Sequence, residues 1–347
     1  MRVVPALALA AAVAACGSDG GSSGSDDGGS GEDHLDVIVL VGGPATDGGF
    51  FQEMVDGMRH AAEEDGDIEV AVRERLLEGG DAALESAVRQ AAQSGDYDLV
   101  IAHGFDLVPA VATVAPDYPD QAFATSLPVQ GDPPNASVYL TDFEDSGYSA
   151  GFLAGTAAAS TGADRVGFIS GPGQDFERQT EDGFRAAVED YAPGTEIDVV
   201  YTGDFDDPQL GQEAAGIMID DGVDVIWNLL SGGQSGVFRA CEEAGPEVLC
   251  FGNGTFSEAA APDVVLGSNY SDYATLLPIW AERLRAGEWS DGDQPYTDIL
   301  SLESGGVAVT DASAVGRERL PDLQDAIDEF RTQALAGEVE VPDSDVG

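Results

Sequence analysis

Residues 35–64 read LDVIVLVGGPATDGGFFQEMVDGMRHAAEE, and this stretch decides the fold. Val37–Val41 is a short apolar run rich in β-branched residues, which indicates a buried strand of a parallel sheet. A glycine-rich loop follows, and apolar residues at helical spacing between Phe50 and Ala62 predict an amphipathic helix. In open α/β sheets, the loops at the carboxyl ends of strands line the ligand crevice. We therefore expect Asp47, Phe50 and Phe51 to contact a ligand.

The same order of strand, loop and helix recurs three times, over residues 98–115, 165–189 and 224–245. The recurring loops are His103–Asp106, Ser170–Asp175 and Ser231–Gln234. Four such units, two in each half of the chain, predict two similar α/β lobes with right-handed crossovers. The same reasoning adds candidate ligand-binding residues in these loops: His103, Phe105, Phe176, Ser231, Gly232, Gly233 and Gln234. His103 and Phe176 each have a structural alternative, as a buried histidine and as a core phenylalanine.

The chain has 347 residues, long enough for two domains of ordinary size. Its net charge is −51, and all 14 basic residues are arginines. Without lysine it can carry neither a P-loop lysine nor a Schiff-base lysine, and so acidic a chain is a poor partner for nucleic acid, whose phosphates need cations. The acidity fits adaptation to high salt, where dense carboxylates keep a surface soluble. A GC-rich genome that favours arginine over lysine is the alternative, and both can apply.

The N-terminus reads as a processing signal. Arg2 precedes the apolar run Val3–Val13, and Ala14-Ala15-Cys16 resembles a bacterial lipobox, in which Cys16 is lipidated and becomes the first mature residue. The alternative is an ordinary signal peptide cleaved nearby. Residues 16–34 are rich in glycine, serine and aspartate and form a flexible tether. No later apolar run approaches the roughly 20 residues of a transmembrane helix.

The predicted organisation divides the rest of the chain between two lobes and a tail. Lobe 1 is expected to comprise residues 35–142 and about 256–286. Lobe 2 is expected to comprise residues 143–255 and about 287–336. Residues 337–347 form an acidic tail. Glycines at 147, 151 and 155 recur every four residues in a predicted helix and would allow close packing.

Two cysteines remain beyond the N-terminal signal, Cys241 on a predicted helix and Cys250 on the next strand. In an extracytoplasmic protein, two interpretations of this pair are open: the cysteines form a disulfide, or both are small buried hydrophobic residues without a bond between them.

Further short motifs lie in order over residues 36–310. They are Asp98-Leu99-Val100-Ile101, Gly104-Phe105, Ala115-Pro116-Asp117-Tyr118-Pro119, Gly151-Phe152-Leu153-Ala154-Gly155, Arg165-Val166-Gly167-Phe168, Gly183-Phe184, Gly203-Asp204-Phe205-Asp206-Asp207-Pro208, Gly222-Val223-Asp224-Val225-Ile226 and the stretch 232–238. Together they resemble the basic membrane lipoprotein (PnrA-like) family, the nucleoside- or purine-binding receptors of ABC importers. The resemblance implies an α/β type I periplasmic-binding-protein fold, with two Rossmann-like lobes joined by a hinge and a ligand closed between them.

The resemblance also suggests roles for individual residues. The family's aspartate falls on Asp47, and its stacking aromatic falls on Phe50, which offers a π-face to a flat base. The family's asparagine falls on Phe51, which either adds a second ring or packs inward. The glycine-rich family loop falls on Ser231–Gln234, where backbone N–H groups at a helix start could bind polar ligand atoms.

Two differences from the family pattern concern the residues that bind the ribose. The family's carboxylate falls near Gly252, and its lysine falls near Ser271, so both groups are missing. The residues that could substitute are Asn253, Asn269 and Asp272. A free purine or another flat polar solute fits these changes better than a strictly nucleoside site.

Catalytic and metal-binding motifs are not found. The sequence has no GxGxxG, P-loop, GxSxG or HExxH motif, and its three histidines lack metal-ligand spacing. Asp204-Phe205-Asp206-Asp207-Pro208 lacks the twelve-residue calcium loop and indicates a surface turn. Trp227 is expected in the core. We therefore expect no enzyme activity, no cofactor and no metal site.

The sequence as a whole predicts a monomeric, extracytoplasmic, lipid-anchored solute-binding protein of an ABC importer, which closes on a purine or nucleoside and delivers it to permease subunits. The alternative is a receptor of the same fold that signals to a membrane sensor protein. Neighbouring genes for a permease and ATPase, or for a sensor kinase, would separate the two.

Overall fold

The apolar runs form two six-stranded sheets in the computed structural model, which describes residues 33–342. The predicted signal peptide, Cys16 and the tether up to residue 32 lie outside the described residues. Within the described part, no helix combines the length and hydropathy that a membrane span requires. Each sheet is covered by helices on both faces, as parallel strands require.

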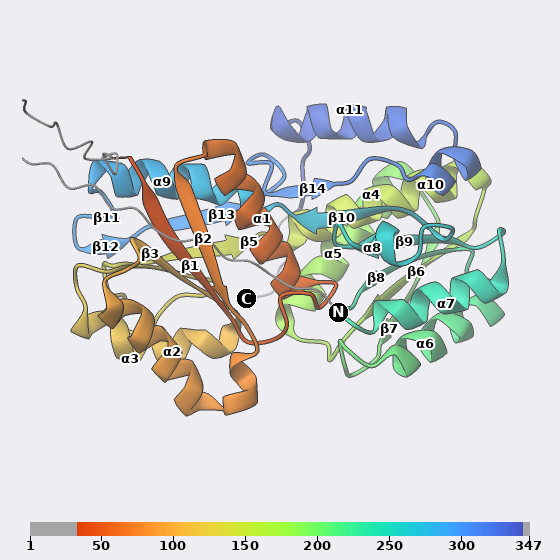
Figure 1. Ribbon diagram of the computed structural model, residues 1–347. Helices are drawn as coiled ribbons and strands as arrows, with labels where there is room; N and C mark the ends of the chain where they lie inside the picture. Colours follow the sequence, from red (N-terminus) through yellow and green to blue (C-terminus); the bar gives the residue numbers. More distant parts are fainter. Residues whose placement is uncertain (1–32, 343–347) are drawn as a thin grey trace, which may run out of the picture. The chain divides into compact units, whose positions relative to one another are not determined.

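Lobe 1 surrounds the sheet with strand order β13-β5-β4-β3-β1-β2, in which all neighbours are parallel. Its elements are β1 (Leu35–Val41), α1 (Phe50–Asp65), β2 (Ile68–Arg73), η1 (Leu76–Gly79), α2 (Asp81–Ser94), β3 (Leu99–His103), η2 (Phe105–Leu107), α3 (Val108–Val114), η3 (Ala115–Asp117), β4 (Ala122–Thr125), β5 (Ala136–Thr141), η4 (Tyr273–Thr275), α9 (Leu276–Ala286), β11 (Ser290–Asp291), β12 (Gln294–Pro295) and β13 (Thr297–Leu300). Helices α1 and α9 pack on one face of the sheet, and α2 and α3 pack on the other (Figure 1).

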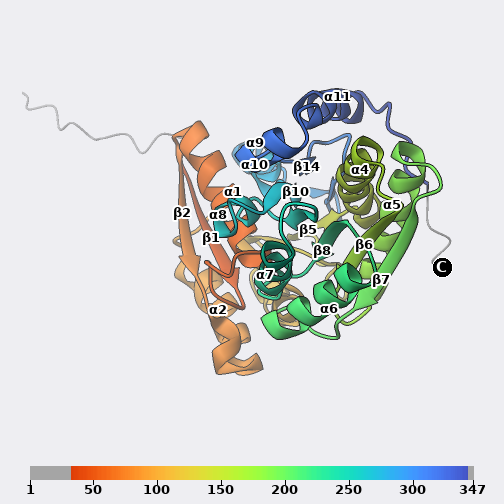
Figure 2. The same ribbon diagram turned by 90° about the vertical axis from the view of Figure 1, so that its right-hand side faces the viewer.

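Lobe 2 repeats this order in its own sheet, β14-β10-β9-β8-β6-β7, where only the edge strand β14 is antiparallel. Its elements are α4 (Phe143–Thr161), β6 (Arg165–Ser170), α5 (Asp175–Tyr191), β7 (Glu196–Tyr201), α6 (Pro208–Asp220), β8 (Val225–Leu229), α7 (Gln234–Ala244), β9 (Leu249–Asn253), α8 (Ser257–Ala260), β10 (Val265–Ser271), β14 (Val307–Val309), α10 (Ala314–Arg319) and α11 (Leu323–Leu335). One face is covered by α4, α5 and α11, and the other by α6 and α7 (Figure 2).

The chain passes between the lobes three times, and two of these passages differ from the predicted boundaries. The first follows β5, between Thr141 and Phe143. The second follows β10, because β10 pairs in parallel with β9, so residues 256–271 belong to lobe 2. The third lies between β13, which pairs with β5 in lobe 1, and β14, which pairs with β10 in lobe 2. Residues 287–300 therefore belong to lobe 1, and their predicted place in lobe 2 is wrong.

Strand β13 is held in lobe 1 by a buried carboxylate. Asp298 accepts two hydrogen bonds of 2.7 Å from the guanidinium of Arg283 on α9, and a third of 3.0 Å from the indole of Trp280. The guanidinium also lies 4.0 Å from the ring centroid of Tyr296. A bidentate ion pair with these extra contacts fixes α9 and β13 to each other.

The predicted close packing of the small-residue helix occurs between α4 and α5. A Cβ atom on Gly147 would lie 1.9 Å from the carbonyl oxygen of Thr180, and one on Gly151 would lie 2.4 Å from that of Phe184. A Cβ on Gly183 of α5 would likewise lie 2.0 Å from the carbonyl oxygen of Glu144. Only glycine permits backbones to approach this closely.

Cys241 of α7 and Cys250 of β9 are joined as a disulfide, with their Cα atoms 6.6 Å apart. Of the two alternatives from the sequence, the structure therefore has the disulfide. Both residues are also buried in the core between α6, α7 and the sheet.

Candidate functional site

The four predicted loops lie where each sheet reverses its strand order. In lobe 1, β1 lies between β2 and β3, and in lobe 2, β6 lies between β7 and β8. Connections from such neighbouring strands leave in opposite directions, and ligands of open α/β sheets bind at this point, outside the carboxyl ends of the strands. The candidate site is therefore sought among the residues that follow β1, β3, β6 and β8.

Three phenylalanines from these loops form a row that crosses from one lobe to the other. The ring centroids of Phe50 and Phe105, both in lobe 1, are 6.1 Å apart. Phe105 and Phe176, which belong to different lobes, are 6.3 Å apart. Phe105 is 44% exposed, so part of its ring is accessible from outside. We call Phe50, Phe105 and Phe176 the aromatic row.

Two further phenylalanines, which the sequence analysis did not select, flank the row in lobe 2. Phe143, at the start of α4, lies 5.0 Å from Phe176, and Phe205, before α6, stacks on Phe176 at 6.1 Å with an interplanar angle of 19°. Phe205 follows the edge strand β7, and this position after a strand is the feature of the sequence from which it could have been predicted. Phe143 immediately follows the first passage between the lobes.

His103 supports Phe50 from behind. Its ring lies 4.0 Å from the Phe50 ring, and its Nε2 lies 3.0 Å from the Phe50 carbonyl oxygen. Because that oxygen can only accept, Nε2 carries the proton, and Nδ1 accepts from the Tyr139 hydroxyl at 2.7 Å. Burial lowers the pKa of His103 to about 3, so the ring is neutral. Both ring nitrogens of His103 are therefore bonded within the protein.

Asp47 and Phe51 organise the loop before α1. The carboxylate of Asp47 accepts hydrogen bonds of 3.0–3.2 Å from the backbone N–H groups of Gly49, Phe51 and Gln52, and so caps the helix. The ring of Phe51 lies against the backbone of Gly43 and packs with the lobe 1 core. Of its two alternatives, Phe51 therefore packs inward.

The amides of Ser231–Gln234 are already bonded within the protein. The N–H groups of Ser231 and Gly233 donate to the Phe205 carbonyl, that of Gly232 donates to the Asp206 carboxylate, and that of Gln234 donates to the Ser231 carbonyl. In this conformation the loop has no spare amide for a ligand.

The Gln234 side chain connects the two lobes. Its Nε2 donates to the carbonyl oxygen of Gly48 in lobe 1 at 2.8 Å, and its Oε1 accepts from the hydroxyl of Ser257. Gly49 packs beside Ser231 in the same place. Together with the contact between Phe105 and Phe176, these interactions show the lobes in contact with each other.

The two predicted asparagines differ. Asn269 is buried: its Oδ1 accepts from the Trp227 indole at 2.9 Å, and its Nδ2 donates to Ser146. Trp227 is a core residue, as expected. Asn253 ends β9 and remains partly exposed, with Asn269 as its partner across the strands.

Two polar residues that were not among the predicted site residues each have one buried oxygen. Asn228, at the end of β8, is fully buried, and its Oδ1 has no hydrogen-bond partner in the described part of the chain. Glu53 lies in the first turn of α1, and its Oε1 is also buried without a partner there. Burial, together with the nearby charges of Asp47 and Asp272, raises the pKa of Glu53 to about 8. No pattern within α1 marks Glu53, because the buried stripe of the helix is formed by other residues, Met54, Val55, Met58, Ala61 and Ala62.

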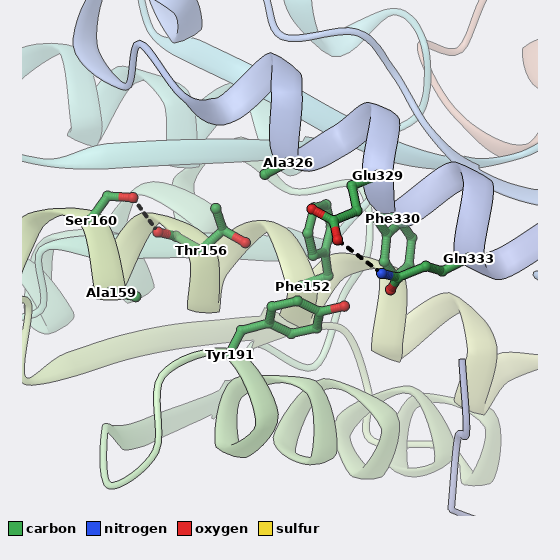
Figure 3. Close-up of a pocket in the computed structure, with 9 residues that line it drawn as sticks. All are labelled: Phe152, Thr156, Ala159, Ser160, Tyr191, Ala326, Glu329, Phe330 and Gln333. Atoms are coloured by element: carbon green, nitrogen blue, oxygen red, sulfur yellow. Dashed lines mark hydrogen bonds between the residues drawn. The ribbon is translucent and has the colours of Figure 1, made fainter. Parts of the chain in front are cut away.

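A separate cavity of about 410 Å³ lies on lobe 2, between α4, α11 and the end of α5 (Figure 3). It is lined by Phe152, Phe330, Tyr191 and polar side chains that bond within their own helices. Gln333 donates to Glu329, and Ser160 donates to the Thr156 carbonyl. None of the predicted ligand residues lines it. Across the residues that the structure describes, no cluster of metal-ligating side chains occurs.

Comparison with known proteins relates this geometry to a family. A family model described as ABC transporter substrate-binding protein PnrA-like matches residues 35–345. A CD4+ T-cell-stimulating antigen of Listeria monocytogenes is 27% identical, over 95% of this chain and 94% of its own. The ABC transporter nucleoside-binding protein BmpA of Lactococcus lactis is 26% identical, over 72% of this chain and 73% of its own.

Among solved structures, a solute-binding protein of an ABC transporter system from Conexibacter woesei is 28% identical and superimposes with a TM-score of 0.76, covering 89% of this chain and 98% of its own. The fold is therefore that of type I periplasmic binding proteins. The chain belongs to the PnrA-like family of ABC transporter substrate-binding proteins.

Proposed function

We propose that this protein binds a purine or a nucleoside between its lobes and delivers it to ABC permease subunits. The observation that carries the proposal is the aromatic row. It consists of three neighbouring rings, which follow strands beside the reversal of strand order in each of the two sheets. Aromatic rings bind flat bases by stacking and do not need charged groups. A relative named as nucleoside-binding supports the same ligand class.

The base is the part of the ligand that these residues are suited to bind. Phe50 is held from behind by neutral His103, so its ring is presented in a fixed orientation. Phe105 and Phe176 would cover a ring that lies against Phe50. Gly252 and Ser271 offer neither the acid nor the lysine of the family's ribose contacts. We therefore propose tighter binding of free bases than of their nucleosides.

Hinge closure is the proposed mechanism. A ligand that touches both lobes stabilises the state in which they meet. The hydrogen bond from Gln234 to Gly48 and the contact between Phe105 and Phe176 would form when the lobes close around the ligand. The passages after β5, after β10 and between β13 and β14 are the proposed hinge.

We also propose that Cys16 is lipidated and anchors the protein on the outer face of the plasma membrane. The proposal rests on the lipobox-like sequence and the tether that follows it. Metabolic labelling with a fatty acid should mark the wild-type protein and leave Cys16→Ser unlabelled. Equal labelling of both would refute the anchor without affecting the binding function.

A thermal-shift screen in molar KCl tests the binding function, with purine bases, nucleosides, sugars and amino acids as ligands. Purine bases should raise the melting temperature most. Phe50→Ala should lose about 1–3 kcal/mol of binding free energy, which is the usual contribution of one stacked ring. Leu127→Ala is the matched control, because Leu127 is an exposed apolar residue after β4 and outside the aromatic row. A shift with sugars or amino acids and none with purines would exclude the purine proposal.

A further inference from the structure

Glu53 belongs to lobe 1, and its Oε1 is buried beside lobe 2. It lies in the first turn of α1, one helical turn after Phe50. Its Oε1 is so close to Gly254, between β9 and α8, that a Cβ atom on that glycine would lie only 2.8 Å away. The backbone N–H groups of Thr255 and Ser271, also in lobe 2, act on the same carboxyl. The contact of the lobes is therefore part of what encloses this side chain.

The surroundings of Glu53 disfavour a negative charge. The charged groups that act on it are the carboxylates of Asp47, before α1, and Asp272, at the start of η4. Tyr270 of β10 and Tyr273 of η4 also face it and remain neutral, because burial raises their own pKa values. His60 acts on Asp272 but is exposed and paired with Glu64. A carboxyl in the first turn of a helix usually benefits from the helix dipole, yet here burial and the two aspartates outweigh it.

We propose that Glu53 couples closure of the lobes, and with it ligand binding, to the uptake of one proton. When the lobes separate, Gly254, Thr255 and Ser271 move away and water reaches the carboxyl. Its pKa then returns toward the ordinary value of 4.5, whereas in the contacting state it is about 8. A proton thus binds the closed state more tightly than the open state, so protonation favours closure. Glu53 is a positioning residue in this scheme, since it acts through the lobe contact.

The sign of the effect follows from these two pKa values. Below about pH 4.5 the carboxyl is protonated in both states, and the contribution of its protonation to the free energy of closure is at its maximum. As the pH rises from there to about 8, the open state loses its proton first, so ligand affinity falls. The limit of this fall is tenfold per pH unit, for a carboxyl that becomes fully hydrated on opening. The inference rests on the proposed closure around a ligand, but it does not depend on which solute is bound.

The test is isothermal titration calorimetry at pH 5.5, 7.0 and 8.5, with a solute that binds in the thermal-shift screen and does not itself titrate in this range. Wild-type affinity should fall several-fold per pH unit. At pH 7, the heat measured in phosphate and in Tris buffers should show uptake of close to one proton per complex. Glu53→Gln keeps the size of the side chain but cannot ionise, so it should bind with nearly constant affinity and without proton uptake. Glu53→Leu should also lose the pH dependence and the proton uptake.

Glu64→Gln is the matched control, because Glu64 is an exposed carboxylate on the same helix. It should keep the wild-type pH profile. Asp145, at the start of α4, has a pKa raised to about 6 by burial, but it is unchanged in all variants and so cancels in the comparison. A wild-type affinity that is constant with pH, or a Glu53→Gln variant with the wild-type slope, would overturn the inference. Binding of a solute other than a purine would refute the proposed ligand and leave this test valid.

Discussion

Replacing Gly147 with alanine should destabilise the protein through the contact between α4 and α5. The added Cβ would lie 1.9 Å from the Thr180 carbonyl oxygen and 2.9 Å from the Phe184 nitrogen. Ordinary contacts of such atoms begin at 3.4 Å, so the helices must separate by about 1.5 Å locally, because both obstructing atoms are backbone.

The size of the effect follows from two opposing terms. Overpacking of this kind costs about 1–3 kcal/mol or more, and the contact with a backbone oxygen places Gly147→Ala at the upper end. Alanine recovers about 1 kcal/mol, because it favours the helix more than glycine does. The expected net loss of unfolding free energy is therefore about 2 kcal/mol.

Gly216→Ala provides the matched control. Gly216 lies within α6, and a Cβ there would meet nothing within 4 Å. The same substitution should therefore stabilise the protein, by about 0.5–1 kcal/mol. Urea unfolding in molar KCl measures the stability of both variants. The dependence of the unfolding free energy on urea concentration should equal that of the wild type, which checks that the transition is unchanged. If Gly147→Ala were as stable as the wild type, or if both variants shifted equally, the account of the packing between α4 and α5 would be refuted.

Two further predictions concern stability. Replacing Cys241 and Cys250 with alanine should lower the unfolding free energy by about 2–3 kcal/mol, because the disulfide closes a short loop in the unfolded chain. Urea unfolding with and without reductant measures this difference. A wild-type protein whose stability does not change with reductant would contradict the prediction. Asp298→Ala should cost about 3–5 kcal/mol, because it leaves the largely buried guanidinium of Arg283 without its carboxylate. Asp117→Ala, which breaks an exposed ion pair with Arg89, is its control and should cost less than about 1 kcal/mol.

The two lobes and the aromatic row could be predicted from local patterns. An apolar run rich in β-branched residues, followed by a glycine-rich loop and an amphipathic stretch, specifies a strand, its carboxyl end and a helix. Phe50, Phe105 and Phe176 each lie in such a loop or at the helix start that follows it, so topology brings each to the carboxyl edge of its own sheet, Phe50 and Phe105 in lobe 1 and Phe176 in lobe 2. The structure places the rings of these three candidates next to one another, together with those of His103 and Phe51.

The predicted polar contacts were harder to assign, because each polar group has several partners within reach. Asp47 caps its own helix, and Asn269 binds an indole from another strand. The sequence shows that these groups can form hydrogen bonds but not which acceptor or donor is nearest after folding. The amides of Ser231–Gln234 were assigned to a ligand for the same reason, whereas the loop before α6 satisfies several of them.

Glu53 and the third passage between the lobes depend on contacts far apart in the chain. Glu53 is enclosed by Gly254 and Thr255, some 200 residues away, so its burial could not be inferred from its own helix. Strand β13 has a pattern that either sheet could accept. Its place in lobe 1 is fixed by pairing with β5 and by the contact between Asp298 and Arg283.

The most direct test of the central claim is a crystal structure of the protein with the purine that binds best. The account predicts one base between the lobes, stacked on Phe50 and covered by Phe105 and Phe176, with the Gln234 side chain still bonded to Gly48. A base bound in the cavity between α4 and α11, or one that leaves the aromatic row free, would contradict it.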